Sequence, residues 1–184
     1  MFEDLDNYEA VARIVVIGVG GAGNNAVNRM IDDDLSSVEF YVANTDKQAL
    51  ATSKAPNRIV LGEKSTGGLG AGGEPSKGKE AAEESVDIIR DIVRGANMVF
   101  IAAGMGGGTG TGAAPVVARI AKEEKCLVVG IVTRPFTFEG KVRMQNATKG
   151  IENLRKNVDT LIIVSNDRIL QLIGNLPLKQ SFQE

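Results

Sequence analysis

Glycine is unevenly distributed along this chain, and its clusters limit what the chain can fold into. Of the 22 glycines, 16 fall in three short stretches at residues 18–23, 67–78 and 104–112. A simple turn requires only one or two glycines. Glycine runs of this density are typical of loops in which the backbone closely approaches a ligand. The sequence therefore predicts three specialised loops.

Apolar runs alternate with helical patterns along the rest of the chain. Continuous apolar runs predict buried strands at residues 14–17, 38–43, 58–61, 97–103, 127–132 and 160–164. Helices are expected after the first glycine loop, over residues 48–52, 79–94 and 113–124, and from a start within 136–143. This alternation predicts an α/β fold with a doubly wound, mostly parallel six-stranded sheet of the Rossmann type.

The stretch at residues 104–112 lies between the predicted strand 97–103 and the predicted helix 113–124. A glycine-rich turn at a helix N-terminus is a place to hold an anion, because unpaired N–H groups and the helix dipole face outward there. Thr109 and Thr111 are expected to add hydroxyl donors. A sharply bent loop without a ligand is the alternative interpretation.

The first glycine stretch satisfies G-x-G-x-x-G with Gly18, Gly20 and Gly23, between a strand and a helix. It indicates a phosphate or a dinucleotide. The second strand ends at Asn44 and Asp46, where ligands of a parallel sheet bind. Asp46 is predicted either to accept a ribose hydroxyl or to lie near a phosphate-bound magnesium ion. Capping of the next helix by Thr45 or Asp46 is the structural alternative.

The middle glycine stretch nearly spells a Walker A motif, but Glu80 stands where Ser or Thr should ligate magnesium. It is interpreted as a mobile loop that closes over the distal end of a phosphate chain, with a surface loop as the alternative. Further along, Glu139 and Arg143 are spaced to share one helical face. They are predicted either to face a sugar and its phosphate or to form an exposed ion pair.

The composition excludes several kinds of function. A formal net charge of −2 gives no indication of a nucleic-acid or membrane surface, and no membrane span or signal peptide is recognised. The chain has no histidine, so the usual general base and most zinc sites are absent, and no metal site made of side chains is predicted. The single cysteine, Cys126, excludes a disulfide framework and is expected in the core.

These motifs together resemble the tubulin/FtsZ family. The resemblance rests on the run from Gly106 to Gly112 with its flanks, and on the matching stretches at residues 18–25, 44–46, 68–73, 133–140 and 165–167. It implies a guanine-nucleotide-binding domain at residues 13–176, preceded by an arm at 1–12 and followed at 177–184 by the start of a central helix that the chain does not complete.

The resemblance also implies roles for individual residues. Phosphates and guanine would contact Gly20, Gly21, Ala22, Gly23, Asn24 and Asn25, and the phosphates would also contact Gly108, Thr109 and Gly110. Ala71, Gly72 and Gly73 would sense the γ-phosphate. Ribose and phosphate would be held by Thr133, Glu139 and Arg143, and the base by Asn166 and Phe182.

The same resemblance implies GTP or GDP as the ligand, with Mg²⁺ held through the phosphates. It implies head-to-tail filaments of a cytoplasmic cell-division GTPase at the division site, with other division proteins as partners. The family's catalytic loop comes from a neighbouring subunit and has no counterpart here, so no catalytic residue is assigned. This chain alone is expected to be nearly inactive, and a separate C-terminal chain could complete it.

Two alternatives remain open at this point. An NAD-dependent dehydrogenase would explain the first glycine loop and Asp46, but neither of the other two loops. A non-enzymatic assembly module, in which the nucleotide only stabilises the fold, is the second alternative.

Overall fold

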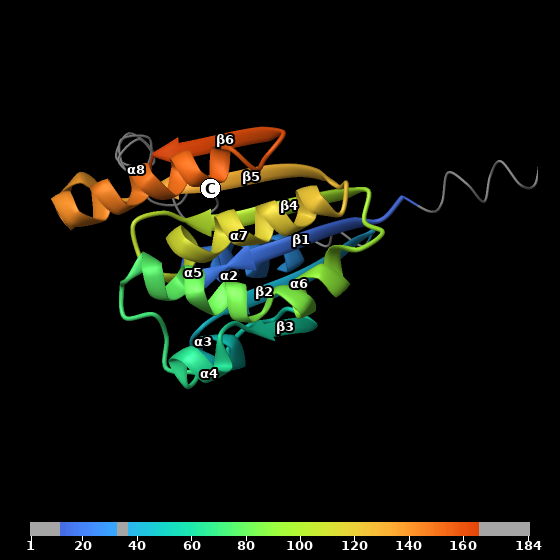
Figure 1. The fold of residues 1–184 in the computed structure, drawn as a ribbon, viewed down its shortest axis with the longest axis horizontal. Coiled ribbons are helices and arrows are strands. Elements are labelled where there is room, and N and C mark those ends of the chain that lie inside the picture. The colour runs from blue at the N-terminus through green and yellow to red at the C-terminus, as the bar shows by residue number, and fades with distance from the viewer. Residues whose placement is uncertain (1–11, 33–36, 166–184) are drawn as a thin grey trace, which may run out of the picture.

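The computed structural model describes residues 12–32 and 37–165, in which helices and strands alternate (Figure 1). The strands are β1 (Ile14–Val19), β2 (Val38–Asn44), β3 (Asn57–Val60), β4 (Met98–Gly104), β5 (Leu127–Arg134) and β6 (Thr160–Ser165). The helices are α2 (Gly20–Asp32), α3 (Lys47–Ala51), α4 (Glu63–Thr66), α5 (Pro75–Glu84), α6 (Val86–Val93), α7 (Thr109–Glu123), the 3₁₀ turn η1 (Thr137–Glu139) and α8 (Lys141–Arg155).

The six strands form one sheet in the order β3-β2-β1-β4-β5-β6, and every neighbouring pair is parallel. This confirms the predicted doubly wound α/β architecture. The chain builds outward from β1 in one direction and then from β4 in the other. The two halves therefore meet between β1 and β4, where a ligand crevice forms in sheets of this type.

Helices cover both faces of the sheet. One core cluster packs α5, α6, α7 and α8 against the side chains of Val15, Ile17 and Ile101. The opposite cluster packs Val27 of α2 and Leu50 of α3 against Val16 and Phe40. Neighbouring residues of β1 thus point into different clusters, as the alternation of a strand requires. The structure consequently has three layers (Figure 1).

The edge strand β6 is less buried than the prediction required. Thr160 and Ile162 are exposed, and 47% of the surface of Ile162 is accessible. Among the described strands, β6 pairs only with β5. The apolar run predicted the strand correctly, but burial on both faces was wrong for it.

Three helix boundaries differ from the prediction. α7 begins at Thr109 instead of residue 113, so the last glycines of its loop are helical. The helix expected over residues 79–94 starts earlier, at Pro75, and is interrupted at Ser85. The Ser85 hydroxyl accepts a hydrogen bond from the Gly62 N–H at 3.1 Å, which holds the break in place.

Cys126 is buried, as predicted, and burial raises the pKa of its thiol. No helix in the described ranges has the length and apolar character that crossing a bilayer requires.

Candidate functional site

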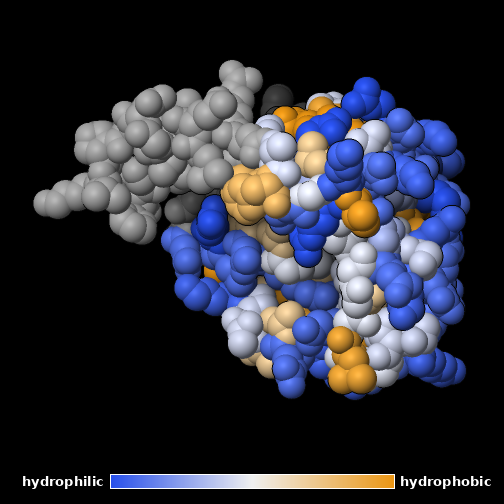
Figure 2. Space-filling model, turned by 90° about the vertical axis from the view of Figure 1, so that its left-hand side faces the viewer, coloured by the Kyte–Doolittle hydropathy of each residue, from blue (hydrophilic) through white to orange (hydrophobic). Residues whose placement is uncertain are grey.

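The candidate site is the crevice at the carboxyl ends of β1 and β4, where the strand order reverses. Figure 2 views this edge of the sheet, and the middle of the visible surface is mostly blue and white, with few apolar side chains. The turns that follow β1 and β4 are the first and third glycine stretches. The crevice is therefore surrounded mainly by backbone.

Three helices begin at the crevice: α2 after β1, α7 after β4, and α5 after the middle glycine loop. None of the three carries an acidic residue in its first turn. The residues that precede α5 and α7, Glu74 and Gly108, make no side-chain cap hydrogen bond. The first N–H groups of these helices are thus free of side-chain acceptors, which makes them suitable for an anion.

The glycine loops contact one another closely. A Cβ on Gly20 would lie 3.0 Å from the Gly110 nitrogen, so the starts of α2 and α7 approach to backbone distance. A Cβ on Gly108 would lie 2.9 Å from both the Ala71 Cβ and the Glu74 nitrogen. The structure therefore brings the three predicted loops together at one place.

Two glycines of the crevice are not explained by protein packing. A Cβ on Gly21 or Gly107 would meet no atom of residues 12–32 and 37–165 within 4 Å. Neither residue has a positive φ, so the backbone does not require glycine there. Gly72 and Gly73 also border open space, although their φ angles are +62° and +77°. The protein alone leaves room for side chains at Gly21 and Gly107, and a ligand close to the backbone would use that room.

The predicted residues Asn24 and Asn44 form part of the frame of the site. Both are 5% exposed. The Asn24 amide donates to the Gly18 carbonyl at 2.9 Å, and the Asn44 amide donates to Asn24 Oδ1 at 3.1 Å. These bonds tie the end of β2 to the turn after β1. Asn25, the next residue of α2, is exposed.

A threonine pair joins β2 to α7. The hydroxyl groups of Thr45 and Thr109 lie 2.7 Å apart, and Thr45 is fully buried. From the sequence, Thr109 is expected to contact a ligand and Thr45 is expected only as a possible helix cap. No local pattern could have paired two residues 64 positions apart.

The structure shows the capping alternative for Asp46. Its Oδ1 accepts hydrogen bonds from the N–H groups of Gln48 at 2.9 Å and Ala49 at 3.4 Å, at the start of α3. Oδ2 of Asp46 has no hydrogen bond within the described residues. A role of Asp46 toward a ligand stays a prediction.

Thr111 is placed differently from the expectation that its hydroxyl faces the ligand. It is 3% exposed, and its Oγ1 accepts a hydrogen bond from the Gly106 N–H at 2.8 Å. Because α7 begins at Thr109, Thr111 is turned inward, and a donor role of its hydroxyl toward a ligand stays a prediction. Thr111 instead fixes the shape of the third glycine loop.

Glu139 and Arg143 form the predicted ion pair, with Arg143 Nη1 3.2 Å from Glu139 Oε1. Glu139 also accepts a hydrogen bond from the Phe136 N–H, which closes the η1 turn. About half of the Arg143 side chain (53%) is exposed, so the guanidinium can reach a ligand. Thr133 lies beside Gly104, where an added Cβ would be 3.5 Å from the Thr133 hydroxyl and 2.6 Å from the Ala22 Cβ.

Two predicted base contacts, Asn166 and Phe182, lie outside the described residues. Within residues 12–32 and 37–165, no group of three or more His, Cys, Asp or Glu side chains could hold a metal ion. What the crevice offers a ligand is chiefly oriented N–H groups.

These features define a doubly wound α/β domain with a crevice lined by helix N-termini, which suits an anion. The family model for the tubulin/FtsZ family, GTPase domain, matches residues 13–174. The chain therefore belongs to the tubulin/FtsZ family. This match does not favour the NAD-dependent dehydrogenase alternative.

Solved structures agree with this assignment. An empty FtsZ dimer from M. jannaschii is 45% identical with a TM-score of 0.88, over 98% of this chain and 54% of that one. The W319Y mutant of the same FtsZ is also 45% identical with a TM-score of 0.89, over 99% of this chain and 55% of the other. GDP-bound CetZ1 from Haloferax volcanii is 29% identical with a TM-score of 0.79, over 84% of this chain and 51% of that one. This chain thus spans about half the length of these relatives.

Proposed function

We propose that this chain is the guanine-nucleotide-binding half of a filament-forming cell-division GTPase. The proposal rests mainly on the convergence of three helix N-termini, none of which has an acidic residue in its first turn. The glycines at this place border space that no described residue fills. Membership of a GTPase family and the GDP bound to the related CetZ1 support guanosine as the nucleoside.

The geometry suggests a division of roles within the crevice. The N–H groups at the start of α2, from Gly20 to Asn25, and those at Gly108, Thr109 and Gly110 would bind the phosphates from opposite sides. Ala71 and Gly73 lie against Gly108, and together with Gly72 between them they would contact the terminal phosphate. Thr133, Glu139 and Arg143 would orient ribose and phosphate, and Asn166 and Phe182 would contact the base.

Mg²⁺ would be held mainly through the phosphates, because the described residues contain no cluster of carboxylates for it. Asp46, with one carboxylate oxygen outside the helix cap, is the residue placed to contact the ion or the ribose. The ion would neutralise phosphate charge in a crevice with few cationic side chains.

Hydrolysis would require groups that this chain does not supply. The relatives are almost twice as long, and the tubulin/FtsZ resemblance implies a catalytic loop donated by the neighbouring subunit of a head-to-tail filament. We infer that this chain alone binds nucleotide and turns GTP over barely or not at all. We further propose that the chain acts at the cytoplasmic division site. Its partners there would be other division proteins and a second polypeptide that supplies the missing half.

Binding and turnover test separate parts of this function. Isothermal titration calorimetry with GTP, GDP and NAD should give binding of both guanine nucleotides and none of NAD. Phosphate release should stay near background for this chain and rise when a polypeptide corresponding to the other half of the relatives is added. Preferential binding of NAD would contradict the proposed ligand, and fast turnover by this chain alone would contradict the proposed division of labour.

A further inference from the structure

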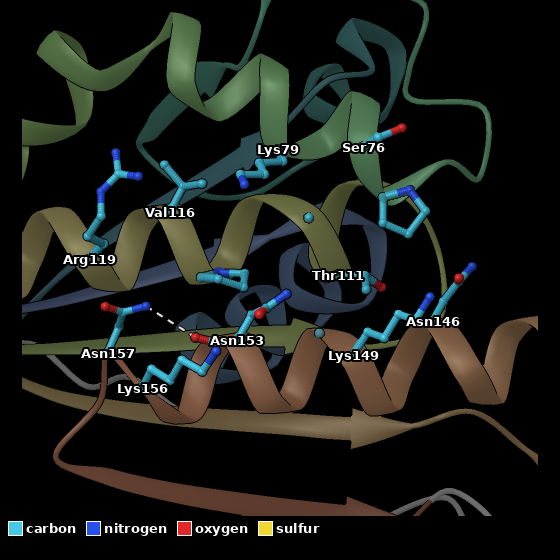
Figure 3. Close-up of a pocket in the computed structure, with 14 residues that line it drawn as sticks. Ser76, Lys79, Thr111, Val116, Arg119, Asn146, Lys149, Asn153, Lys156 and Asn157 are labelled. Carbon is cyan, nitrogen blue, oxygen red and sulfur yellow. Dashed lines mark hydrogen bonds between the residues drawn. The ribbon is translucent and has the colours of Figure 1, made fainter.

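A cavity of about 500 Å³ lies between α5, α7 and α8 and borders the crevice at the first residues of α5, Pro75 and Ser76. Figure 3 shows it as a trough between α7 and α8, with Lys79 reaching in from α5 and Lys149 and Lys156 rising from α8. Its lining includes four cationic side chains and no aspartate or glutamate from the described residues. We call it the α7–α8 groove.

The lysines of the groove are available for a ligand. Lys79, Lys149 and Lys156 are exposed, and none has an ion-pair partner among the described residues. The fourth cation, Arg119, is already paired with both oxygens of Glu83 at 2.6 and 2.9 Å. Lys79 lies within electrostatic range of Glu83. Lys149 and Lys156 therefore carry most of the net positive charge of the trough, which attracts anionic ligands.

The wall formed by α8 repeats its chemistry every seven residues. Asn146 and Lys149 are followed by Asn153 and Lys156, and all four residues line the groove. Seven residues are about two helical turns, so equivalent groups lie about 10 Å apart along the axis. A ligand with one anionic group would draw both flexible lysine side chains together, whereas a ligand with charges spaced about 10 Å apart binds them without that rearrangement. The repeat therefore favours a long ligand with regularly spaced charges.

Asparagine beside each lysine indicates that the ligand has a peptide backbone. A side-chain amide offers one acceptor and donors, which matches the N–H and C=O groups of an extended chain. Among the described residues, the amide of Asn153 has no hydrogen-bond partner, whereas the Asn157 amide donates to the Asn153 carbonyl at 3.1 Å. In a polyproline II segment, residues three apart share a face and lie about 9 Å apart. That separation is close to the spacing of the lysines.

The floor of the groove lets such a segment lie close to the helices. Gly112 and Gly150 line it, and each occurs where two helices are packed too tightly for a side chain. A Cβ on Gly150 would lie 2.6 Å from Thr111 Cγ2, and one on Gly112 would lie 2.0 Å from the Pro75 carbonyl oxygen. Because these glycines have no side chains, the lysines and asparagines project beyond the floor of the groove.

We propose that the α7–α8 groove binds an extended acidic segment of a partner protein. Lys149 and Lys156 each contact one carboxylate, and successive carboxylates are three residues apart. The amide of Asn153 contacts the ligand backbone between them, whereas the amide of Asn146 donates to the Gly106 carbonyl. Lys79 contributes a further cation from the opposite wall. This surface lies outside the nucleotide crevice and does not depend on the function proposed for it.

The test uses this chain and a fluorescein-labelled peptide of sequence Glu-Pro-Ala-Glu-Pro-Ala-Glu, followed by fluorescence anisotropy. The variant Lys149→Gln/Lys156→Gln should weaken binding about tenfold. The matched variant Lys64→Gln/Lys141→Gln removes the same charge from exposed lysines elsewhere and should change affinity less than about twofold. Thermal melting by circular dichroism checks that both variants are folded.

A third variant, Asn153→Leu, separates recognition of a peptide from general charge attraction. It leaves the net charge unchanged and should still weaken binding about fivefold, because the ligand backbone loses its amide partner. Equal effects of the two lysine pairs, or full binding by Asn153→Leu, would overturn the proposal. Competitive displacement of the peptide by GTP would also overturn it, since that result places the peptide in the crevice. A peptide with Gln in place of every Glu should not bind.

Discussion

The crevice and the α7–α8 groove are both suited to anions, but they achieve this with different parts of the chain. The crevice uses the N–H groups of three helix starts and glycines that expose the backbone. The groove uses the side chains of Lys79, Lys149 and Lys156. Backbone groups are fixed in place by the fold, whereas lysine side chains are mobile and strongly hydrated. The crevice is therefore expected to select a ligand of one defined shape, and the groove is expected to bind its ligand with less strict geometry.

The largest expected effect comes from filling the open side of a crevice glycine. Gly107→Val places a side chain where the protein leaves space, so the fold should be retained while a ligand is excluded. GTP affinity, measured by calorimetry, should fall at least about a hundredfold, close to 3 kcal/mol. The groove variant Lys149→Gln/Lys156→Gln should leave GTP affinity unchanged. Normal GTP binding by a folded Gly107→Val protein would break the distinction between the two regions.

The threonine pair that frames the crevice should contribute to stability. Thr109→Val removes one hydroxyl and leaves the fully buried Thr45 hydroxyl without its partner. The free energy of unfolding in urea should fall by about 1–2 kcal/mol. The double variant Thr45→Val/Thr109→Val should recover part of that loss, because no buried polar group remains unpaired. A double variant that loses the sum of the two single losses would contradict this explanation.

Asp46 allows its helix cap to be separated from a role toward the ligand. Asp46→Ala should lower the free energy of unfolding by about 1 kcal/mol through the lost cap of α3, while Asp46→Asn should retain most of it. If Asp46 also contacts the nucleotide or its ion, GTP affinity should fall in both variants. Unchanged GTP affinity in Asp46→Asn would leave the cap as the function of this carboxylate.

The smallest effect concerns the ion pair beside the groove. Hydrogen bonds from Arg119 lower the pKa of Glu83 from its ordinary value of 4.5. The stabilisation is therefore complete above that ordinary value and is lost as the pH falls through the lower pKa of the folded state. Because the pair is partly exposed, Glu83→Gln should destabilise the protein by only about 0.5 kcal/mol at pH 7. In urea titrations the difference between wild type and variant should shrink progressively as the pH falls below 4.5.

Much of the fold followed from local patterns, because continuous β-branched runs identify central strands of a parallel sheet. Helix boundaries were harder to predict. α7 begins at Thr109 within a glycine run whose intrinsic helix propensity is poor, and tight packing of Gly110 on the Gly104 carbonyl overrides that propensity. The interruption at Ser85 depends on Gly62, a residue of a different loop.

In the candidate site, too, local patterns predicted some features, whereas others depend on contacts between distant parts of the chain. The glycine loops and the strand ends predicted where the crevice lies, because parallel strands bring their carboxyl ends to one edge. The inward orientation of Thr111 and the partner of Thr109 were not predictable, since both depend on contacts across the fold. The predicted nucleotide contacts themselves, and the domain boundaries at residues 12 and 176, stay predictions.

Helix α7 belongs to both regions, with its first turn in the crevice and Val116 and Arg119 on the groove. Asn146 adds a second connection, because its amide donates to the Gly106 carbonyl of the crevice loop at 3.4 Å. Helix α7 has 15 residues, about 22 Å in length, and Pro115 interrupts its hydrogen bonds between the crevice turn and the groove residues. The two regions are therefore joined by one helix that can bend at Pro115. By thermodynamic reciprocity, any occupant of the groove that changes nucleotide affinity by some factor must have its own affinity changed by the same factor.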